Sequence, residues 1–500
     1  MTPKTRFYRF LEIVPGSLVW LTLISAISLS FVRPLWVMYF IIVFDTLWLF
    51  RVSYFVFYLT VSWWRYRRDT RIDWLPRAMA HPRFRELKHV IFLPFVNEDV
   101  DVIGPTLRNL AESDYPVRES FIVVLCGEAR AGEDHFNRVF DRMKSEFGDR
   151  FFRFEGTLHP ADLPDEIPGK GSNLSYAGQQ IMKSVIDPLG LRYEDVTVSM
   201  FDCDTTVHGR YFAYLAYKYL NHPNPTRSSF QPVALYNNNI WESPAAVRVS
   251  AFGTTFWLLT ELARPERMFT FASHSMPLQM LVDVGWWQRD VVSDDSRIFL
   301  QAYLHYDGEY EVTPLYMPIS MDTVMTGGYR KALGALYRQQ RRWAWGVENL
   351  PYFIVNSLRH PAIPWRKRIF HTWNMMEGMY TWATAPLLMF LLGYLPIWLA
   401  PESLRSAAFY QNTPHTLETL MTLSMAGVLV SGILSFTLLP PKPTHRPRWF
   451  WLFMILQWAL LPVTFIVFGA FPAIDAQTRM MLGRYLGFNV TEKKRQPNPS

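Results

Sequence analysis

The chain has 500 residues, of which 50% are apolar, and it contains 19 Trp and 37 Phe. Part of it is therefore expected in lipid, whereas a mean hydropathy of +0.01 excludes a protein that is embedded in the membrane throughout. The net charge of +7 gathers beside the apolar segments, which favours an anionic membrane surface over nucleic acid as a partner. Only two cysteines occur, Cys126 and Cys203, which excludes a disulfide framework.

Two apolar stretches open the chain. Val14 to Val32 carries no charge and has about the ~20 residues that a bilayer-crossing helix needs. A signal peptide is the alternative, but a second stretch, Leu35 to Trp64, follows at once and favours uncleaved insertion. Within the second stretch Arg51 is expected near an interface, while Asp45 lies deeper and either packs against another helix or is functional.

A basic cluster and then an α/β pattern follow the second stretch. By the positive-inside rule, four arginines place the next segment in the cytoplasm: Arg65, Arg67, Arg68 and Arg71. Short apolar strands then alternate with helical stretches, which predicts an α/β domain with a mostly parallel sheet. The clearest strands are His89 to Phe95, Phe121 to Cys126 and Val196 to Phe201.

Three apolar runs near the other end predict further membrane helices: Met379 to Ala400, Leu420 to Leu439 and Phe450 to Phe471. Five crossings would leave the basic residues beyond the last run outside, against the positive-inside rule. Either the last run, interrupted by Pro462, does not fully cross or a helix is miscounted, and a cytosolic tail is favoured. The expected domains are a two-helix membrane region (1–72), a cytosolic domain (73–358), a membrane region of about three helices (359–475) and a basic tail (476–500).

Asp202 and Asp204 stand just beyond the strand Val196 to Phe201. The carboxyl edge of an α/β sheet is where ligands usually bind. Alternate carboxylates there can share a hard cation such as Mg²⁺ or Mn²⁺, which would neutralise a diphosphate. The alternative is a solvated acidic turn.

Asp294 and Asp295 follow Ser293 at the start of a helical pattern. Ser followed by acids is what an ordinary helix N-terminus favours. A carboxylate fixed there can also accept the proton of an attacking hydroxyl. The two interpretations are compatible.

Gln339, Arg342 and Trp343, within QQRRW, share one helical face. Arg342 can hold diphosphate oxygens and Trp343 can offer a flat face to a sugar. A basic juxtamembrane helix in contact with lipid headgroups is the alternative.

The order DCD, SDD and QQRRW, in a domain that opens with LPFVNED and lies between membrane helices, resembles processive-type family-two glycosyltransferases, the cellulose and hyaluronan synthase-like group. The resemblance covers about His89 to Gly346. It implies a Rossmann-like GT-A fold and an inverting single displacement. Asp204 is then the metal ligand, Asp202 lies near the nucleotide, Asp295 is the general base with Asp294 beside it, and the QQRRW helix stands at the acceptor mouth.

Four further positions match the family less tightly. Glu98, in PFVNE, and Lys170, in KGSN, stand where relatives contact the donor. Glu128 ends the second strand, where many relatives carry paired aspartates. His274, in FASHSMP, lies where the family places an acceptor-facing loop, although it is also a candidate structural histidine.

The expected function is that of a multi-pass glycosyltransferase of the plasma (inner) membrane. It would take a nucleotide-sugar, UDP-linked, with Mg²⁺ or Mn²⁺, and serve a growing polysaccharide or a lipid-linked acceptor, as a homo-oligomer or with a partner subunit. The alternatives are a single-transfer sugar-lipid synthase, a non-catalytic scaffold that binds nucleotide-sugar, and a transporter.

Overall fold

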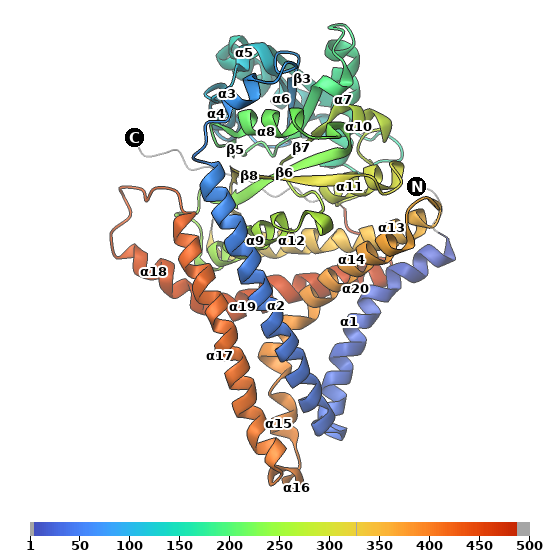
Figure 1. The fold of residues 1–500 in the computed structure, drawn as a ribbon, viewed down its shortest axis with the longest axis vertical. Coiled ribbons are helices and arrows are strands. Elements are labelled where there is room, and N and C mark those ends of the chain that lie inside the picture. Colours follow the sequence, from blue (N-terminus) through green and yellow to red (C-terminus); the bar gives the residue numbers. More distant parts are fainter. Residues whose placement is uncertain (1–4, 327, 488–500) are drawn as a thin grey trace.

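The computed structural model describes residues 5–326 and 328–487. A broad α/β domain sits on a narrowing group of apolar helices (Figure 1). Eight strands of the described residues form one sheet in the order β3-β2-β1-β4-β7-β6-β8-β5. The strands are β1 (Lys88–Pro94), β2 (Phe121–Glu128), β3 (Arg153–His159), β4 (Val196–Met200), β5 (Thr206–Val207), β6 (Ser228–Tyr236), β7 (His274–Pro277) and β8 (Glu311–Met321).

The sheet is mostly parallel, as predicted. β1 lies parallel to β2 and β4, β2 to β3, and β6 to β8. β7 is antiparallel to β4 and β6, and the short β5 is antiparallel to β8. Every residue of β2 and β4 is buried, which explains why these strands are continuous apolar runs rather than alternating ones.

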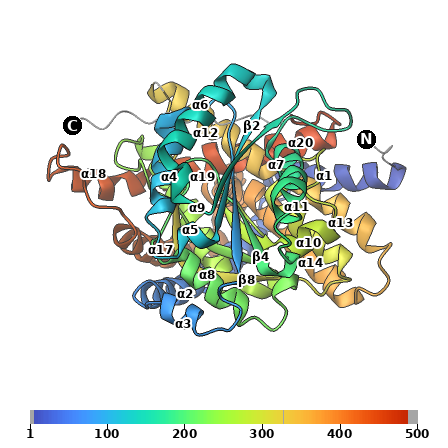
Figure 2. The ribbon, with the colours of Figure 1, turned by 90° about the horizontal axis from the view of Figure 1, so that it is seen from above.

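Helices cover both faces of the sheet (Figure 2). One face packs against α3 (Leu75–Met79), α4 (Val100–Ala111), α5 (Val117–Ser120), α6 (Glu133–Phe147) and α8 (Tyr211–Leu220). The other packs against α7 (Lys170–Ile181), α9 (Ala245–Leu262), α10 (Leu278–Asp283), α11 (Asp294–His305) and α13 (Asn349–Ser357). Two glycines allow α6 to approach closely: a Cβ on Gly127 would lie 2.3 Å from Phe136 Cδ2, and one on Gly156 would lie 2.6 Å from Phe140 Cε2.

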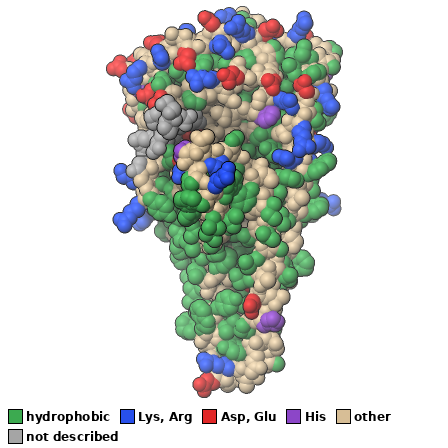
Figure 3. Space-filling view, turned by 90° about the vertical axis from the view of Figure 1, so that its left-hand side faces the viewer, with side chains coloured by type: hydrophobic (Ala, Val, Ile, Leu, Met, Phe, Trp, Pro, Cys, Tyr) green, Lys and Arg blue, Asp and Glu red, His purple; other side chains and the backbone are tan. Residues whose placement is uncertain are grey.

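Beyond the sheet lie α12 (Tyr329–Ala344), η7 (Trp345–Glu348) and the apolar helices. The latter are α1 (Arg6–Val32), α2 (Pro34–Asp69), α14 (Trp365–Leu387), η8 (Leu388–Leu392), α15 (Leu395–Leu399), α16 (Glu402–Arg405), α17 (Ala408–Thr437), α18 (Phe450–Leu456), η9 (Gln457–Leu460), α19 (Leu461–Phe465), η10 (Ile466–Ala470) and α20 (Phe471–Met481). Within the described residues four segments are long and apolar enough to cross a membrane: α1, α2, α17 and Phe450–Met481. Apolar side chains cover the narrowing part of the molecule, and charged ones mark both its ends (Figure 3).

Two of the predicted membrane runs differ from continuous spans. Met379 to Ala400 is not among the four segments, because Pro386 is followed by the π-helical η8 and by a break at Gly393 before α15. It nevertheless descends to the narrow end, where α1, α2 and α17 converge (Figure 1). The last run is broken at η9 and Pro462, and α18, α19 and α20 lie across the molecule rather than along α17 (Figure 1).

Close contacts fix the apolar helices to one another. A Cβ on Gly427 of α17 would lie 2.5 Å from Val52 Cγ1 of α2, so the missing side chain lets a valine of α2 pack directly on the α17 backbone. The Arg9 guanidinium at the start of α1 donates to the Met480 carbonyl, 2.7 Å away, at the end of α20. Both ends of the described chain therefore meet beside the α/β domain.

The two charged positions of α2 have different surroundings. Arg51 forms an ion pair with Glu377 of α14. Asp45 is buried, at 6% exposure. Arg51, which was expected near an interface, is thus paired with a glutamate of a second helix, whereas the deeper Asp45 is buried.

Candidate active site

The DCD motif leaves the sheet at the carboxyl end of β4. The Asp202 backbone N–H donates to Ser273 Oγ at 3.2 Å, so the segment before β7 supports this turn. Asp204 is fully buried, and its Oδ2 accepts the backbone N–H of Asp322 at 3.0 Å. The two carboxylates thus differ in setting, since Asp204 is held inside while the Asp202 side chain remains 30% exposed.

Lys170, the first residue of α7, joins two of the predicted motifs. Its ammonium lies 2.9 Å from Asp202 Oδ1 and 3.1 Å from Asp295 Oδ1. Burial alone would lower the pKa of this ammonium, but the charges of Asp202, Asp295 and Asp294 outweigh burial and raise it. One cation therefore holds the DCD and SDD carboxylates face to face, although they lie 32 and 125 positions away from it in the chain.

Asp294 and Asp295 occupy different environments at the start of α11. Asp294 is 4% exposed, and burial, reinforced by the Asp295 charge, raises the pKa of its carboxyl to about 7, against the effect of Lys170 and Arg342. The Asp295 side chain is 28% exposed, and its backbone carbonyl accepts Thr270 Oγ1–H at 2.6 Å. Asp295 is thus the accessible carboxylate, while Asp294 is the enclosed one.

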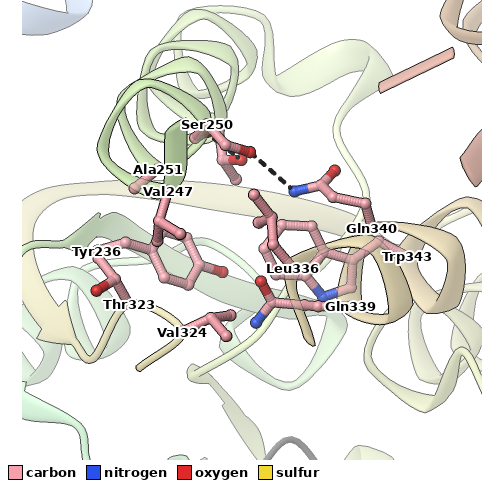
Figure 4. A pocket seen from close by; sticks show the side chains of 11 residues that line it. Tyr236, Val247, Ser250, Ala251, Thr323, Val324, Leu336, Gln339, Gln340 and Trp343 are labelled. Atoms are coloured by element: carbon pink, nitrogen blue, oxygen red, sulfur yellow. Dashed lines mark hydrogen bonds between the residues drawn. The ribbon is translucent and has the colours of Figure 1, made fainter. Parts of the chain in front are cut away.

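The QQRRW helix, α12, borders a small cavity (Figure 4). Gln339, Gln340 and Trp343 line it from α12, facing Tyr236 and the start of α9. The rings of Trp343 and Tyr236 lie 5.7 Å apart, and Gln340 Nε2 donates to Ser250 Oγ at 3.3 Å. The cavity volume is about 10 Å³, which is room for about one water. A sugar could enter only if these side chains move.

Arg342, on the same helix, interacts electrostatically with the acidic SDD motif. Its charge acts on the Asp294 carboxyl, which places α12 beside the start of α11. The neighbouring Arg341 turns away to Asp475 of α20, with 2.9 Å between the charged atoms. The two arginines of QQRRW therefore serve different partners.

Glu98 and Glu128 lie at the ends of β1 and β2, at the same edge of the sheet. Glu98 Oε2 accepts the backbone N–H of Val96 at 2.8 Å and the side chain is buried. Burial raises the pKa of the Glu128 carboxyl, while its ion pair with Arg130 opposes that shift. The Glu98 charge also raises the pKa of Glu128. The two glutamates are therefore close to one another.

The residues present fit a hard divalent cation only in part. Among the described residues no three His, Cys, Asp or Glu side chains converge as a ready metal site. Asp202 and Asp204 supply carboxylate oxygens, which suit Mg²⁺ or Mn²⁺, and Mg²⁺ in particular is usually held by one or two carboxylates together with phosphates and water. The donor set fits a cation that arrives with a diphosphate.

Several residues beside Asp204 were not predicted from the sequence. Asp322 directly follows the apolar strand β8, as Asp202 follows soon after β4. An acid at the end of an apolar strand was therefore the sequence pattern that could have identified it. Asn238 and Asn239 follow β6 and bond to Asp204 O at 3.0 Å and to Thr323 O at 3.2 Å.

His274, in contrast, was a candidate from the sequence. It is fully buried in β7, where Nδ1 contacts the Phe271 carbonyl at 2.6 Å and burial lowers its pKa to about 4.

The family model described as glycosyl transferase family group 2 matches residues 197–473, more than half of the 500 residues. The chain belongs to this family. Membership, together with the mostly parallel sheet and its flanking apolar helices, confirms the predicted GT-A-type fold. As a family 2 glycosyltransferase, the chain carries DCD, SDD and QQRRW inside the matched region.

Three solved structures are similar to this family 2 glycosyltransferase. The mannosyltransferase PcManGT from Pyrobaculum calidifontis, in complex with GDP-Man and Mn²⁺, has 15% identity and a TM-score of 0.40 over 86% of this chain and 99% of that one. TarS of S. aureus has 14% identity and a TM-score of 0.30 over 68% and 54%. GalNAc-T7 with UDP, GalNAc and Mn²⁺ has 10% identity and a TM-score of 0.31 over 59% and 57%. No curated protein matches the chain.

Proposed function

We propose that this chain is a multi-pass membrane enzyme that transfers a sugar, with inversion, from a nucleotide-sugar to a growing polysaccharide, in the manner of the cellulose and hyaluronan synthase-like group. The observation that carries the proposal is the Lys170 ammonium, which bridges Asp202 and Asp295. It brings the donor and base motifs to one point, as a single displacement requires.

Asp295 is the general base of the proposed reaction. An acceptor hydroxyl attacks the anomeric carbon from the side opposite the diphosphate, its proton passes to an Asp295 oxygen, and the bond from that carbon to the diphosphate oxygen breaks. Asp295 suits the role because its side chain is 28% exposed, whereas Asp294 is enclosed and has a raised pKa. The raised pKa means that Asp294 is protonated more readily than an exposed aspartate, which reduces the negative charge beside the base.

Cationic side chains receive the departing diphosphate. Lys170 and Arg342 both act on the acidic cluster, and both can contact phosphate oxygens once a donor enters. A divalent cation held by Asp202 and Asp204 would neutralise charge on the leaving group. Glu98 and Glu128, at the neighbouring strand ends, would contact the nucleoside, for which UDP is the first candidate.

Gln339 and Trp343 form the acceptor side. The Trp343 ring lies close to the Tyr236 ring, with an angle of 49° between the ring planes, and aromatic rings suit the apolar faces of a sugar. The closed cavity implies that the acceptor separates these rings on entry.

A single-transfer synthase of a sugar lipid is the second candidate. The helices around the cavity, α9 and α12, rest on the transverse segment: a Cβ on Gly253 would lie 3.9 Å from Phe465 Cε1, and Phe468 packs against the cluster that contains Leu336. An acceptor anchored in the bilayer would therefore reach the cavity by a short path. Product length separates the two candidates.

The α/β domain is proposed to face the cytosol at the plasma membrane. Arg65, Arg67 and Arg68 lie in the last turns of α2, and Arg71 follows this helix on the domain side. At the narrow end, marked by α16 in Figure 1, fewer basic residues occur: Arg33 stands between α1 and α2, and Arg405 belongs to α16. The proposed crossings are α1, α2, the η8–α15 segment and α17, with α18 to α20 along the inner interface. An even number of crossings returns the C-terminal end to the cytosol and removes the conflict with the positive-inside rule.

The test is release of free nucleotide by purified protein in detergent, with UDP- and GDP-sugars and Mg²⁺ or Mn²⁺. One donor should turn over, and Asp204→Ala should lose metal-dependent donor binding. If a donor binds but no acceptor supports turnover, a scaffold is favoured instead. If no donor either binds or turns over, the proposal is refuted.

A further inference from the structure

Glu348, in the turn η7 after the QQRRW helix, contacts the start of α11. Its Oε1 accepts the backbone N–H groups of Val292 and Ser293, at 3.1 and 2.9 Å, and the Ser293 hydroxyl at 2.7 Å. Ser293 is the N-cap of α11, yet its own side chain makes no capping hydrogen bond to the helix. A carboxylate from a distant segment therefore stabilises the helix end that carries Asp294 and Asp295.

The second carboxylate oxygen binds the acceptor helix. Oε2 accepts the Trp345 indole N–H at 2.9 Å, and Trp345, at 1% exposure, directly follows α12. One side chain thus connects the end of the helix that bears Arg342 and Trp343 to the start of the helix that bears the proposed base.

Further bonds hold the same junction. Arg297 of α11 donates through Nε to Asn349 Oδ1 at 2.7 Å, and Asn349 Nδ2 donates to Ser296 Oγ at 2.8 Å. The Arg297 guanidinium also stacks on Tyr352, 3.8 Å from the ring centroid. The first turn of α11 is therefore tied to η7 and α13, and Glu348 is the member of this network that reaches both helices.

The side chain at position 348 must accept hydrogen bonds without donating any. All four groups around the Glu348 carboxylate donate hydrogen bonds, and an ionised carboxylate only accepts. A glutamine would bring an NH₂ group against the indole N–H or against the start of α11, so the conservative amide is predicted not to substitute.

We propose that Glu348 is a positioning residue of the transfer reaction: it sets the distance between the base carboxylate on α11 and the acceptor-binding face of α12. The inference rests on the proposed function, because it assumes that Asp295 and Trp343 act on one acceptor. Glu348 itself touches no substrate, and the described contacts of Asp202, Asp204 and Lys170 do not include it.

The first test compares Glu348→Gln with wild type, and with Glu146→Gln, a partly exposed glutamate paired with Arg108, as the matched control. Glu348→Gln should lower kcat about 10- to 100-fold, since small displacements of reacting groups cost factors of this size. The donor KM should change less than kcat, because Lys170, Asp202 and Asp204 are held by contacts that do not involve Glu348. The control should retain wild-type values.

A rescue variant separates positioning from general damage. In Glu348→Gln/Trp345→Phe the indole N–H that opposes the amide is gone, so kcat should recover several-fold over the single Glu348 variant. A double variant whose loss equals the product of the two single losses would overturn the inference, as would a wild-type kcat in Glu348→Gln.

Hydrogen exchange supplies a readout that does not need turnover. Amides of residues 292–300 should exchange faster in Glu348→Gln, while those of α7 should not change. Unchanged exchange at residues 292–300 would overturn the inference even in an active enzyme. A wild-type protein that turns over no donor would refute the proposed function instead, and the exchange experiment would still decide whether Glu348 holds α11.

Discussion

Replacing Asp294 by asparagine should make the stability of the protein less dependent on pH. In the folded protein burial raises the pKa of this carboxyl from 3.8 to about 7. The unfolded chain therefore loses this proton at lower pH than the folded one, so the group costs little below about pH 4 and progressively destabilises the fold as the pH rises towards 7. Above pH 7 the cost no longer grows.

The size of the effect follows from the shift. About three pKa units at about 1.4 kcal/mol each correspond to about 4 kcal/mol at pH 8, and less than half of that is already present at pH 5. The advantage of Asp294→Asn over wild type should therefore grow by about 2 to 3 kcal/mol between pH 5 and pH 8. At about 2.1 cal/mol/K of unfolding entropy per residue, that is a rise of roughly 2 to 5 °C in the difference between their Tm values for a protein of this size.

The assay is thermal unfolding in detergent by intrinsic fluorescence, at matched scan rates, at four pH values from 5 to 8. Asp149→Asn, at an exposed position of the same domain, is the control and should differ from wild type by the same amount at every pH. A constant difference for Asp294→Asn would refute the reasoning. It would mean that Arg342 and Lys170 keep Asp294 ionised throughout.

The remaining predictions concern chemistry, packing and membrane topology. Asp295→Asn should abolish transfer and leave donor binding nearly intact, and unchanged turnover would remove it as the base. Trp343→Ala should raise the acceptor KM or shorten the product, as chromatography of the product would show. Gly178→Ala should destabilise by about 1 to 3 kcal/mol, because its Cβ would lie 2.1 Å from the Trp286 ring, whereas Gly378→Ala, with open space, should not. In intact cells a cysteine at Ser403 should react with an impermeant reagent and one at Arg484 should not; reaction at both would restore an odd number of crossings.

The sheet and the acidic motifs were predictable because each depends on local pattern. Val196 to Phe201 is an apolar strand followed at once by acids, and the edge at which parallel strands end is fixed by topology rather than by distant contacts. The bridge from Lys170 to Asp295 was not predictable, because it joins residues 125 positions apart. Glu348 carried no signal either, since its partners include backbone N–H groups that any sequence provides.

The membrane region shows the other limit of sequence reasoning. Hydropathy counts apolar residues but says nothing of the direction in which a helix runs. Phe450 to Phe471 and Met379 to Ala400 are similar in apolar content, yet the first lies across the molecule and the second descends to its narrow end (Figure 1). The proline and π-helical breaks at Pro386 and Pro462 decide the course of each segment, and their effect depends on the helices packed beside them.

The uninterrupted course of α2 connects bilayer thickness to catalysis. This helix runs for 36 residues without internal Gly or Pro. Two hydrogen bonds attach its last turns to the α/β domain: Arg65 donates to the Tyr316 hydroxyl at 2.7 Å, and the Tyr214 hydroxyl donates to Asp69 Oδ2 at 2.6 Å. A bilayer thinner than the apolar length of the lower half tilts a helix of this kind. Since no hinge separates the two halves, the sheet would tilt with it, and the active site would change its height and angle above the lipid surface. The acyl-chain length of the surrounding lipids then becomes a variable of the reaction rate.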